Sequence, residues 1–305
     1  MKLTKDVFKI NAHEVTHVIA EFIKLHFGKM GKTGIVTPIS GGLDSSVVVS
    51  LCVKAVGKDN VVGLMLPERD GNDEAEKYAR VIAQHLGIKT HKVNISRTMK
   101  AVGIYNSIIC WIPFKSLRTS LARKFMQADG GNYYKKCREG KEGKFWQDVV
   151  TKQIARTYAK QRVRMLHAFK FADEHDLMVV GCAHKSEDLA GLFVKFGVDD
   201  NADLMPIKNL FRSHLLQLAD HLGVPPEISG RSPNPDVVPG VTDKYLDILG
   251  VESERVDLIF YGLENNIDLG DIAKELGLSV EKVQEIKHTM DKSHYQRNPC
   301  LAPLF

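Results

Sequence analysis

The sequence lacks features that define several large classes of proteins. No apolar run comes near the ~20 residues that a membrane-spanning helix needs. The first residues hold no apolar core followed by a small-residue cleavage site, so we expect no signal peptide. The five cysteines are odd in number, far apart and without a CxxC pair, which argues against a disulfide framework and against a zinc or iron–sulfur site. These absences favour a cytoplasmic protein.

The overall composition is that of an ordinary globular protein, with 44% apolar and 26% charged residues among 305. The formal net charge of +5 is unevenly distributed. The stretch 115–170 holds 15 Lys and Arg but only 4 Asp and Glu, so it carries +11 and the rest of the chain carries −6. A basic segment of this kind indicates either an anionic ligand or a solvated face.

Short apolar strands alternate with helices along much of the chain. The pattern predicts strands at 34–39, 61–66, 90–95 and 177–182, and helices at 11–27, 47–56, 74–86 and 155–175. This alternation predicts an α/β fold, a doubly wound parallel sheet with helices on both faces. Ligands of such folds bind beyond the carboxyl ends of the strands.

Two segments interrupt the alternation. We interpret about 110–150, which holds both tryptophans, as a basic insertion in a single domain of residues 1–305. Five prolines between 225 and 239 argue against regular structure there. After them the pattern predicts a helical C-terminal segment of about 250–292, with helices at 252–263, 269–276 and 279–290.

The strongest chemical signal is the stretch Ser40-Gly41-Gly42-Leu43-Asp44-Ser45-Ser46, between an expected strand and an expected helix. Small residues let backbone N–H groups surround an anion, and the helix N-terminus adds the positive end of its dipole. The stretch lacks the GxxxxGK[ST] pattern, so it predicts a polyphosphate site that is not of the Walker type. Asp44 would repel phosphates unless a cation lay between, which makes it a candidate Mg²⁺ ligand. The alternative is a Gly-Gly turn followed by a helix cap.

This motif and several later blocks stand in the order found in the N-type ATP pyrophosphatases, and the sequence most resembles the ammonia-dependent NAD synthetase family. The likeness covers about 12–110 and 155–299, and its later blocks are 160–165, 181–187, 195–197, 202–207 and 218–225, with His294 near the end. The resemblance implies an adenylating ligase. ATP would activate the carboxylate of nicotinic acid adenine dinucleotide with release of pyrophosphate, and ammonia would displace AMP to give NAD. It also implies a homodimer.

The resemblance also implies which residues form the ATP site. Residues 40–46 match the pyrophosphate loop, and Glu187 matches a second Mg²⁺ carboxylate that acts with Asp44. Cys182, Arg212 and Asn234 lie at further nucleotide contacts. All three depart from the family, which has a threonine, a lysine and a hydroxyl-bearing residue at these places.

The dinucleotide site follows from the same resemblance. Arg162, Lys195 and Asp203 match positions that bind the deamido substrate, the last two at its reacting carboxyl, with His294 and Tyr295 as terminal contacts. Asp203 is the better candidate for taking the ammonia proton, since a carboxylate can accept it. Arg164 follows Arg162 by two positions on a helix, so the two side chains cannot share one face, and we expect a structural role for Arg164.

The sequence differs from the family at four other positions, near the expected sites of the nucleotide and of the carboxylate substrate. They are Tyr158 for an asparagine, Val194 for a threonine, Lys244 for an acid and Tyr295 for a lysine. The phosphate loop and the metal carboxylates match the family. The sequence therefore supports an adenylation reaction more firmly than it supports any one carboxylic acid as the substrate.

Three other functions remain open at this point. One is amidation of a different carboxylate. Another is a tRNA-modifying ATP pyrophosphatase, favoured by a helix-turn-helix pattern at 269–290 and by aromatic residues within the basic stretch, namely Tyr133, Tyr134, Phe145 and Trp146. The third is a nucleotide-binding regulator without turnover. No glutaminase block is visible, so the nitrogen would come from free ammonia or from a separate glutaminase.

Overall fold

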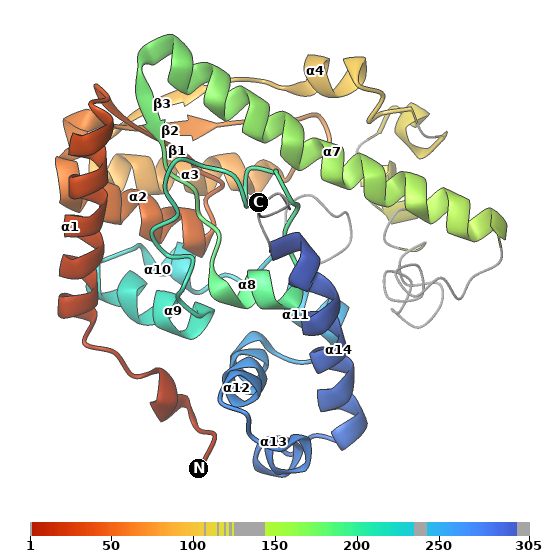
Figure 1. Ribbon diagram of the computed structural model, residues 1–305. Coiled ribbons are helices and arrows are strands. Elements are labelled where there is room, and N and C mark those ends of the chain that lie inside the picture. The colour runs from red at the N-terminus through yellow and green to blue at the C-terminus, as the bar shows by residue number, and fades with distance from the viewer. Residues whose placement is uncertain are drawn as a thin grey trace, which may run out of the picture.

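The computed structural model describes residues 2–106, 108–114, 116–118, 120–121, 124, 144–234 and 243–297 (Figure 1). Within them, four parallel strands form one sheet in the order β3-β2-β1-β4. The strands are β1 (Gly34–Pro38), β2 (Val61–Met65), β3 (Lys89–Lys92) and β4 (Leu177–Val179). Each is one to three residues shorter than the sequence predicts, and the predicted parallel sheet is confirmed.

Helices connect and extend this sheet. The described α-helices are α1 (Ala12–Met30), α2 (Leu43–Val56), α3 (Asp73–Leu86), α4 (Ser96–Ala101), α7 (Lys144–His175), α8 (Lys185–Ala190), α9 (Arg212–His221), α10 (Pro226–Ser229), α11 (Lys244–Leu249), α12 (Ser253–Glu264), α13 (Leu269–Leu276) and α14 (Val280–Arg297). Short 3₁₀ turns are η1 (Lys5–Phe8), η2 (Lys58–Asn60) and η3 (Ile108–Trp111).

The central strand β1 is buried on both faces, and its side chains alternate between two cores. Ile35 packs in the cluster that contains Val48 of α2 and Leu215 of α9. Val36 faces the other way, into the cluster that contains Phe171 of α7. Figure 1 shows α2 and α9 below the sheet, α1 upright at its left, and the long α7 above it, so the predicted cover of helices on both faces is confirmed.

The C-terminal helices form a separate apolar cluster. Phe260 of α12, Ile272 of α13 and Val283 of α14 are fully buried there, and the cluster extends to Leu189 of α8. The contact between α8 and α14 attaches this helical region to the sheet. The predicted helical C-terminal region is therefore confirmed, and α14 continues seven residues beyond the expected end at 290.

Several element ends differ from the prediction for local reasons. Asn11 caps α1 as expected by accepting from Glu14 N, but Gly28 does not end this helix. The helix continues to Met30 and ends at Gly31, which has φ +63° and takes the left-handed conformation that suits glycine. α2 begins at Leu43, four residues earlier than expected.

The expectation of no regular structure among the prolines is wrong at one place. Residues Pro226–Ser229 form α10, because proline is well tolerated in the first turn of a helix, where its missing N–H has no partner to lose. Most of the predicted basic insertion at 110–150 lies outside the described residues, as do 235–242. The division into one domain with this insertion therefore stays a prediction.

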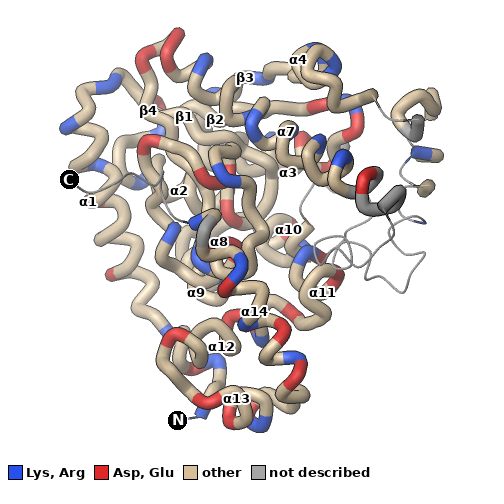
Figure 2. Tube along the Cα trace, turned by 45° about the vertical axis from the view of Figure 1, so that its right-hand side comes forward, with Lys and Arg blue, Asp and Glu red and all other residues tan. Residues whose placement is uncertain are grey.

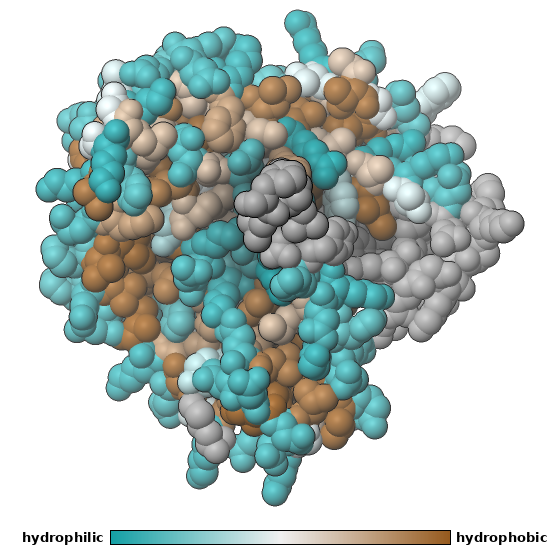
Figure 3. All heavy atoms as spheres, in the orientation of Figure 1, coloured by the Kyte–Doolittle hydropathy of each residue, from teal (hydrophilic) through white to brown (hydrophobic). Residues whose placement is uncertain are grey.

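One side of α1 is apolar and exposed. Val18 is 60%, Phe22 42% and Leu25 53% exposed, and Figure 3 shows a hydrophobic patch over this helix. No helix among the described residues is long and apolar enough to cross a membrane.

Candidate active site

A cavity of about 840 Å³ lies beyond the carboxyl ends of the parallel strands. Its walls include Ile39 after β1, Leu66 after β2 and Cys182 after β4. This is the place that the topology predicts for a ligand, and the volume lies in the range of small-molecule sites.

The predicted phosphate loop forms one end of this cavity. Ser40, Gly42, Leu43, Asp44 and Ser45 line it, whereas Gly41 and Ser46 support it from behind. Gly42 is the N-cap of α2, so the first N–H groups of this helix have no acceptor within the helix. The hydroxyls of Ser45 and Ser46 donate to Gly42 O at 3.2 and 2.8 Å and hold the turn closed. The loop thus presents a helix N-terminus to the cavity, as an anion site requires.

Gly41 is required by the packing behind this turn. Its φ is +71°, and a Cβ there would lie 2.6 Å from Tyr78 Cβ and from Ala79 N of α3. Arg231 ties the same turn from the other side by donating to Gly41 O at 3.0 Å, with its guanidinium over the Tyr78 ring. The turn is therefore held between α3 and the segment that precedes 232–234.

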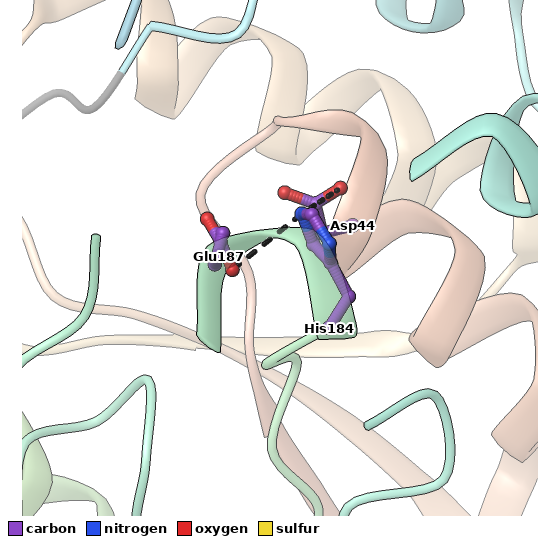
Figure 4. A group of neighbouring side chains, drawn as sticks. All are labelled: Asp44, His184 and Glu187. Atoms are coloured by element: carbon purple, nitrogen blue, oxygen red, sulfur yellow. Dashed lines mark ion pairs between the residues drawn. The ribbon is translucent and has the colours of Figure 1, made fainter. Parts of the chain in front are cut away.

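Two carboxylates and an imidazole meet beside the loop (Figure 4). Asp44 comes from the first turn of α2, Glu187 from the first turn of α8, and His184 immediately precedes α8. His184 Nε2 lies 3.7 Å from Asp44 Oδ1 and 3.6 Å from Glu187 Oε2. The structure brings the two predicted metal carboxylates together. In the sequence His184 is one residue of the 181–187 block, and no pattern there signals its place between the two acids.

Each carboxylate also faces a buried cation. Arg212 Nη1 lies 3.6 Å from Asp44 Oδ1, and Lys244 Nζ pairs with Glu187 Oε1. Burial raises the pKa of Asp44, but His184, Lys244 and Arg212 outweigh it and hold that pKa below its ordinary value. Burial acts to lower the pKa of Lys244, but Glu187 and Asp44 outweigh it and raise that pKa. Figure 2 shows basic and acidic segments side by side around α8. Asp44 and Lys244 are therefore both charged in the cavity.

Arg212 is positioned by a buried network at the start of α9. Asp257 of α12 accepts from Ser213 N at 2.9 Å, from Ser213 Oγ at 2.7 Å and from Ser186 Oγ. Ser186 Oγ in turn accepts from Arg212 N at 2.9 Å. The network fixes the relative position of α8, which carries Glu187, and α9.

Asp199 is a further acid of the cavity wall, and the sequence did not predict its role. Asp199 lines the wall and accepts from Gln161 Nε2, while Arg164 Nη1 donates to Gln161 Oε1 at 3.0 Å. Burial and the nearby Glu187 raise the pKa of Asp199 to about 6. Its only sequence signal is the acidic pair that follows the 195–197 block. Arg164, expected to be structural, also lines the cavity.

The predicted dinucleotide residues lie elsewhere. Arg162 is exposed, on a different side of α7 from Arg164 as expected, and its Nε donates to Lys195 O at 3.3 Å. Asp203 is exposed, and its carboxylate accepts from Val179 N at 2.8 Å. None of the three, Arg162, Lys195 and Asp203, lines the cavity. His294 is exposed on α14, and the side chain of Tyr295 lies outside the described part.

The remaining predicted nucleotide contacts do line the cavity. Cys182 and Asn234 form part of its wall together with Arg212. Burial raises the pKa of the Cys182 thiol well above its ordinary value, so it remains protonated. Its Sγ lies 3.9 Å from Pro38 O.

A buried ion pair forms the wall beyond β2. The side chain of Glu68 has no exposed surface, and it accepts from Lys160 Nζ at 2.6 Å, from Tyr105 Oη at 2.6 Å and from Asp70 N at 2.9 Å. These contacts join the loop after β2 to α7. They give the cavity a fixed wall opposite the phosphate loop.

The residues around Asp44 fit a divalent cation. Asp44 Oδ1 and both ring nitrogens of His184 are buried and have no hydrogen-bond partner among the described residues. The nearest ligand atoms of Asp44, His184 and Glu187 all lie within 4.8 Å of one another. Carboxylate oxygens and imidazole are common ligands of divalent metals.

Known proteins resemble this chain in both sequence and fold. The NAD synthase family model matches residues 15–107 and 115–300. The NH(3)-dependent NAD(+) synthetase of Coprothermobacter proteolyticus is 34% identical over 268 residues, which cover 86% of this chain and 88% of that protein.

Two solved structures share the fold. One is an NMN synthetase from Francisella tularensis, with a TM-score of 0.69 at 21% identity. The other is an NH3-dependent NAD synthetase from Campylobacter jejuni, with a TM-score of 0.66 at 18% identity. Each comparison covers 97% of this chain and 100% of the other, and each supports the α/β architecture described above.

Proposed function

This chain belongs to the NAD synthase family, and we propose that it forms NAD from nicotinic acid adenine dinucleotide, ammonia and ATP. A carboxylate oxygen of the dinucleotide attacks the α-phosphorus of ATP, and pyrophosphate leaves. Ammonia then attacks the acyl carbon, AMP leaves, and the nitrogen gives up one proton. The observation that carries this function is the phosphate loop, with Asp44 opposite Glu187, at the carboxyl edge of the sheet.

The protein's own cations support the first half of this reaction. The N-terminus of α2 and the side chains of Arg212 and Lys244 converge on the loop, where the triphosphate would bind. Negative charge builds up on the leaving pyrophosphate, and fixed positive groups in a water-poor cavity stabilise it more than water does. Arg231 keeps the loop in place, so these groups need little rearrangement.

We propose Asp44 and Glu187 as the protein ligands of a Mg²⁺ ion. When bound, such an ion would neutralise phosphate oxygens and orient ATP. What supports the assignment is that the two partly buried carboxylates have ligand atoms within 4.8 Å of one another and that Asp44 Oδ1 has no hydrogen-bond partner among the described residues.

The proton of the attacking ammonia needs an acceptor near the acyl adenylate. We propose Asp199 for this role, because its carboxylate lines the cavity and is held by Gln161. Asp203, the acceptor expected from the sequence, is exposed, and its carboxylate is engaged by Val179 N. The binding roles expected for Arg162, Lys195, His294 and Tyr295 stay predictions, as do a cytoplasmic location, a homodimer and a separate glutaminase as ammonia source.

The direct test incubates purified protein with ATP, Mg²⁺, ammonium and nicotinic acid adenine dinucleotide. We expect NAD, AMP and pyrophosphate in equal amounts. Parallel reactions replace the dinucleotide by nicotinic acid mononucleotide, by other carboxylic acids or by tRNA, with pyrophosphate release as the readout. Release with one of these and none with the dinucleotide would refute the proposal, and ATP binding without release under any acceptor would indicate a regulator.

A further inference from the structure

His184 is the most unusual side chain of the cavity region. It is fully buried, and neither ring nitrogen has a hydrogen-bond partner among the described residues. Buried polar atoms are nearly always bonded, so an unpartnered imidazole needs an explanation. Asp44 Oδ1, the carboxylate atom that faces it, has no hydrogen-bond partner either, and Arg212 Nη1 comes no nearer to it than 3.6 Å. Orphaned atoms on two neighbouring side chains indicate a shared ligand that binds both.

The distances around His184 suit a metal ion. Two ligands that each lie about 2.1 Å from one ion can be at most about 4.2 Å apart. His184 Nε2 lies 3.7 Å from Asp44 Oδ1 and 3.6 Å from Glu187 Oε2, within that limit (Figure 4). Glu187 uses its other oxygen, Oε1, for Lys244, which leaves Oε2 on the side of the imidazole. The ligand atoms of all three residues lie within 4.8 Å of one another, so small side-chain movements would bring them around one ion.

We propose that Nε2 of His184 is the third protein ligand of the divalent ion held by Asp44 and Glu187, and that this ligand makes the site prefer Mn²⁺ to Mg²⁺. The inference rests on the proposed function, because it concerns the ion of the same polyphosphate site. Mg²⁺ prefers oxygen ligands, whereas imidazole suits transition metals. An imidazole that is already buried between the two carboxylates loses no side-chain freedom when it binds.

The test uses protein labelled with ¹⁵N-histidine, loaded with Mn²⁺ and inorganic pyrophosphate, which contains no nitrogen. Pulsed EPR then reports whether a histidine nitrogen is bound directly to the ion. We expect ¹⁵N coupling in the native protein and its loss in His184→Gln. The matched control is His167→Gln, on α7 outside the cavity lining, where the imidazole bonds Thr98 Oγ1; it should keep the coupling.

Metal competition gives a second readout. We expect His184→Gln to lower the affinity for Mn²⁺ by at least about tenfold and the affinity for Mg²⁺ by less. An equal loss for both ions would overturn the preference. The ligand assignment is overturned if native protein binds no Mn²⁺, if bound Mn²⁺ shows no ¹⁵N coupling, or if the coupling persists in His184→Gln. The native measurement stands even where the variant does not fold.

NAD formation is assayed on the same samples, so that the two proposals can fail separately. Coupling without NAD formation would refute the proposed function and leave the ligand in place. NAD formation with Mn²⁺ but without coupling would refute the ligand and leave the function.

Discussion

Lys244 pairs with Glu187 inside the cavity, and both side chains are nearly buried, at 8% and 13% exposure. Where the family resemblance implies an acid, this chain has Lys244, and the ion pair with Glu187 depends on that lysine. The neighbouring Glu187 raises the pKa of Lys244, so the pair places a cation next to the expected site of the polyphosphate. A buried pair of this kind is costly to break, because the remaining charge has no water around it.

We expect Lys244→Met to lower the free energy of unfolding by about 3–5 kcal/mol, since it leaves Glu187 buried and unpaired. Urea unfolding of Lys244→Met, Glu187→Gln and the double variant forms a thermodynamic cycle. The double variant should be less destabilised than the sum of the single changes. Additive losses would mean that the two charges do not stabilise one another.

In variants of the metal carboxylates the loss of chemistry should exceed what any loss of stability explains. Asp44→Asn and Glu187→Gln should each slow pyrophosphate release by at least about 10²-fold, because each removes a ligand of the ion that neutralises the leaving group. Circular dichroism should show an intact fold in both. Asp220→Asn, on the exposed end of α9, is the matched control and should release pyrophosphate at the native rate. Unchanged turnover in both cavity variants would remove the metal assignment.

Asp199 and Asp203 can be separated by a pair of identical changes. Asp199→Asn should lower the rate of the ammonia step by about 10²–10⁴-fold and leave ATP–pyrophosphate exchange with the dinucleotide nearly unchanged. Asp203→Asn should lose the bond from Val179 N and cost about 1 kcal/mol of stability, with near-native amidation. Rapid-quench measurement of the two half-reactions distinguishes them. The reverse pattern would restore Asp203 as the proton acceptor.

Features with local causes can be predicted from this sequence, whereas features that depend on distant packing cannot. The turn Ser40–Ser46 and the strand β1 could be predicted because small residues and an apolar run have local causes. Asp199 and Lys244 could not be placed, because their burial depends on packing between segments distant in the chain. The sequence shows a histidine at position 184, but its place between two acids depends on how α8 is positioned relative to α2. The sequence therefore predicts the phosphate loop, whereas the charged groups around the loop can be identified only from the three-dimensional structure.

The buried Glu68 network predicts how stability depends on pH. Burial raises the pKa of Glu68, but Lys160 and the hydrogen bonds from Lys160, Tyr105 and Asp70 N outweigh it, so the pKa lies below its ordinary value of 4.5. A depressed folded-state pKa contributes stability that is present above the ordinary value and is lost as pH falls through the folded pKa. The free energy of unfolding should therefore fall in acid below about pH 4.5.

Urea unfolding from pH 7 to pH 3 checks this dependence. Glu68→Gln should be less stable than native at pH 7, since Lys160 is left buried and unpaired, and its stability should change less in acid. Glu21→Gln removes the same charge from an exposed position on α1 and should follow the native curve. A Glu68→Gln curve parallel to the native one would show that Glu68 does not carry the acid sensitivity.

Gly41 should tolerate no side chain, because the space beside its Cα is filled by α3. In Gly41→Ala the new Cβ would meet Tyr78 and Ala79 at 2.6 Å, and alanine at φ +71° adds backbone strain of about 1–3 kcal/mol. The turn can relieve the clash only by moving away from α3 and into the cavity, so we expect a raised KM for ATP as well as a lowered melting temperature. Gly28→Ala is the matched control: its Cβ would meet nothing within 4 Å, and within α1 it should stabilise the protein by up to about 1 kcal/mol. If Gly41→Ala lowered stability and left the KM for ATP unchanged, the turn would not be the part of the cavity that binds the phosphates.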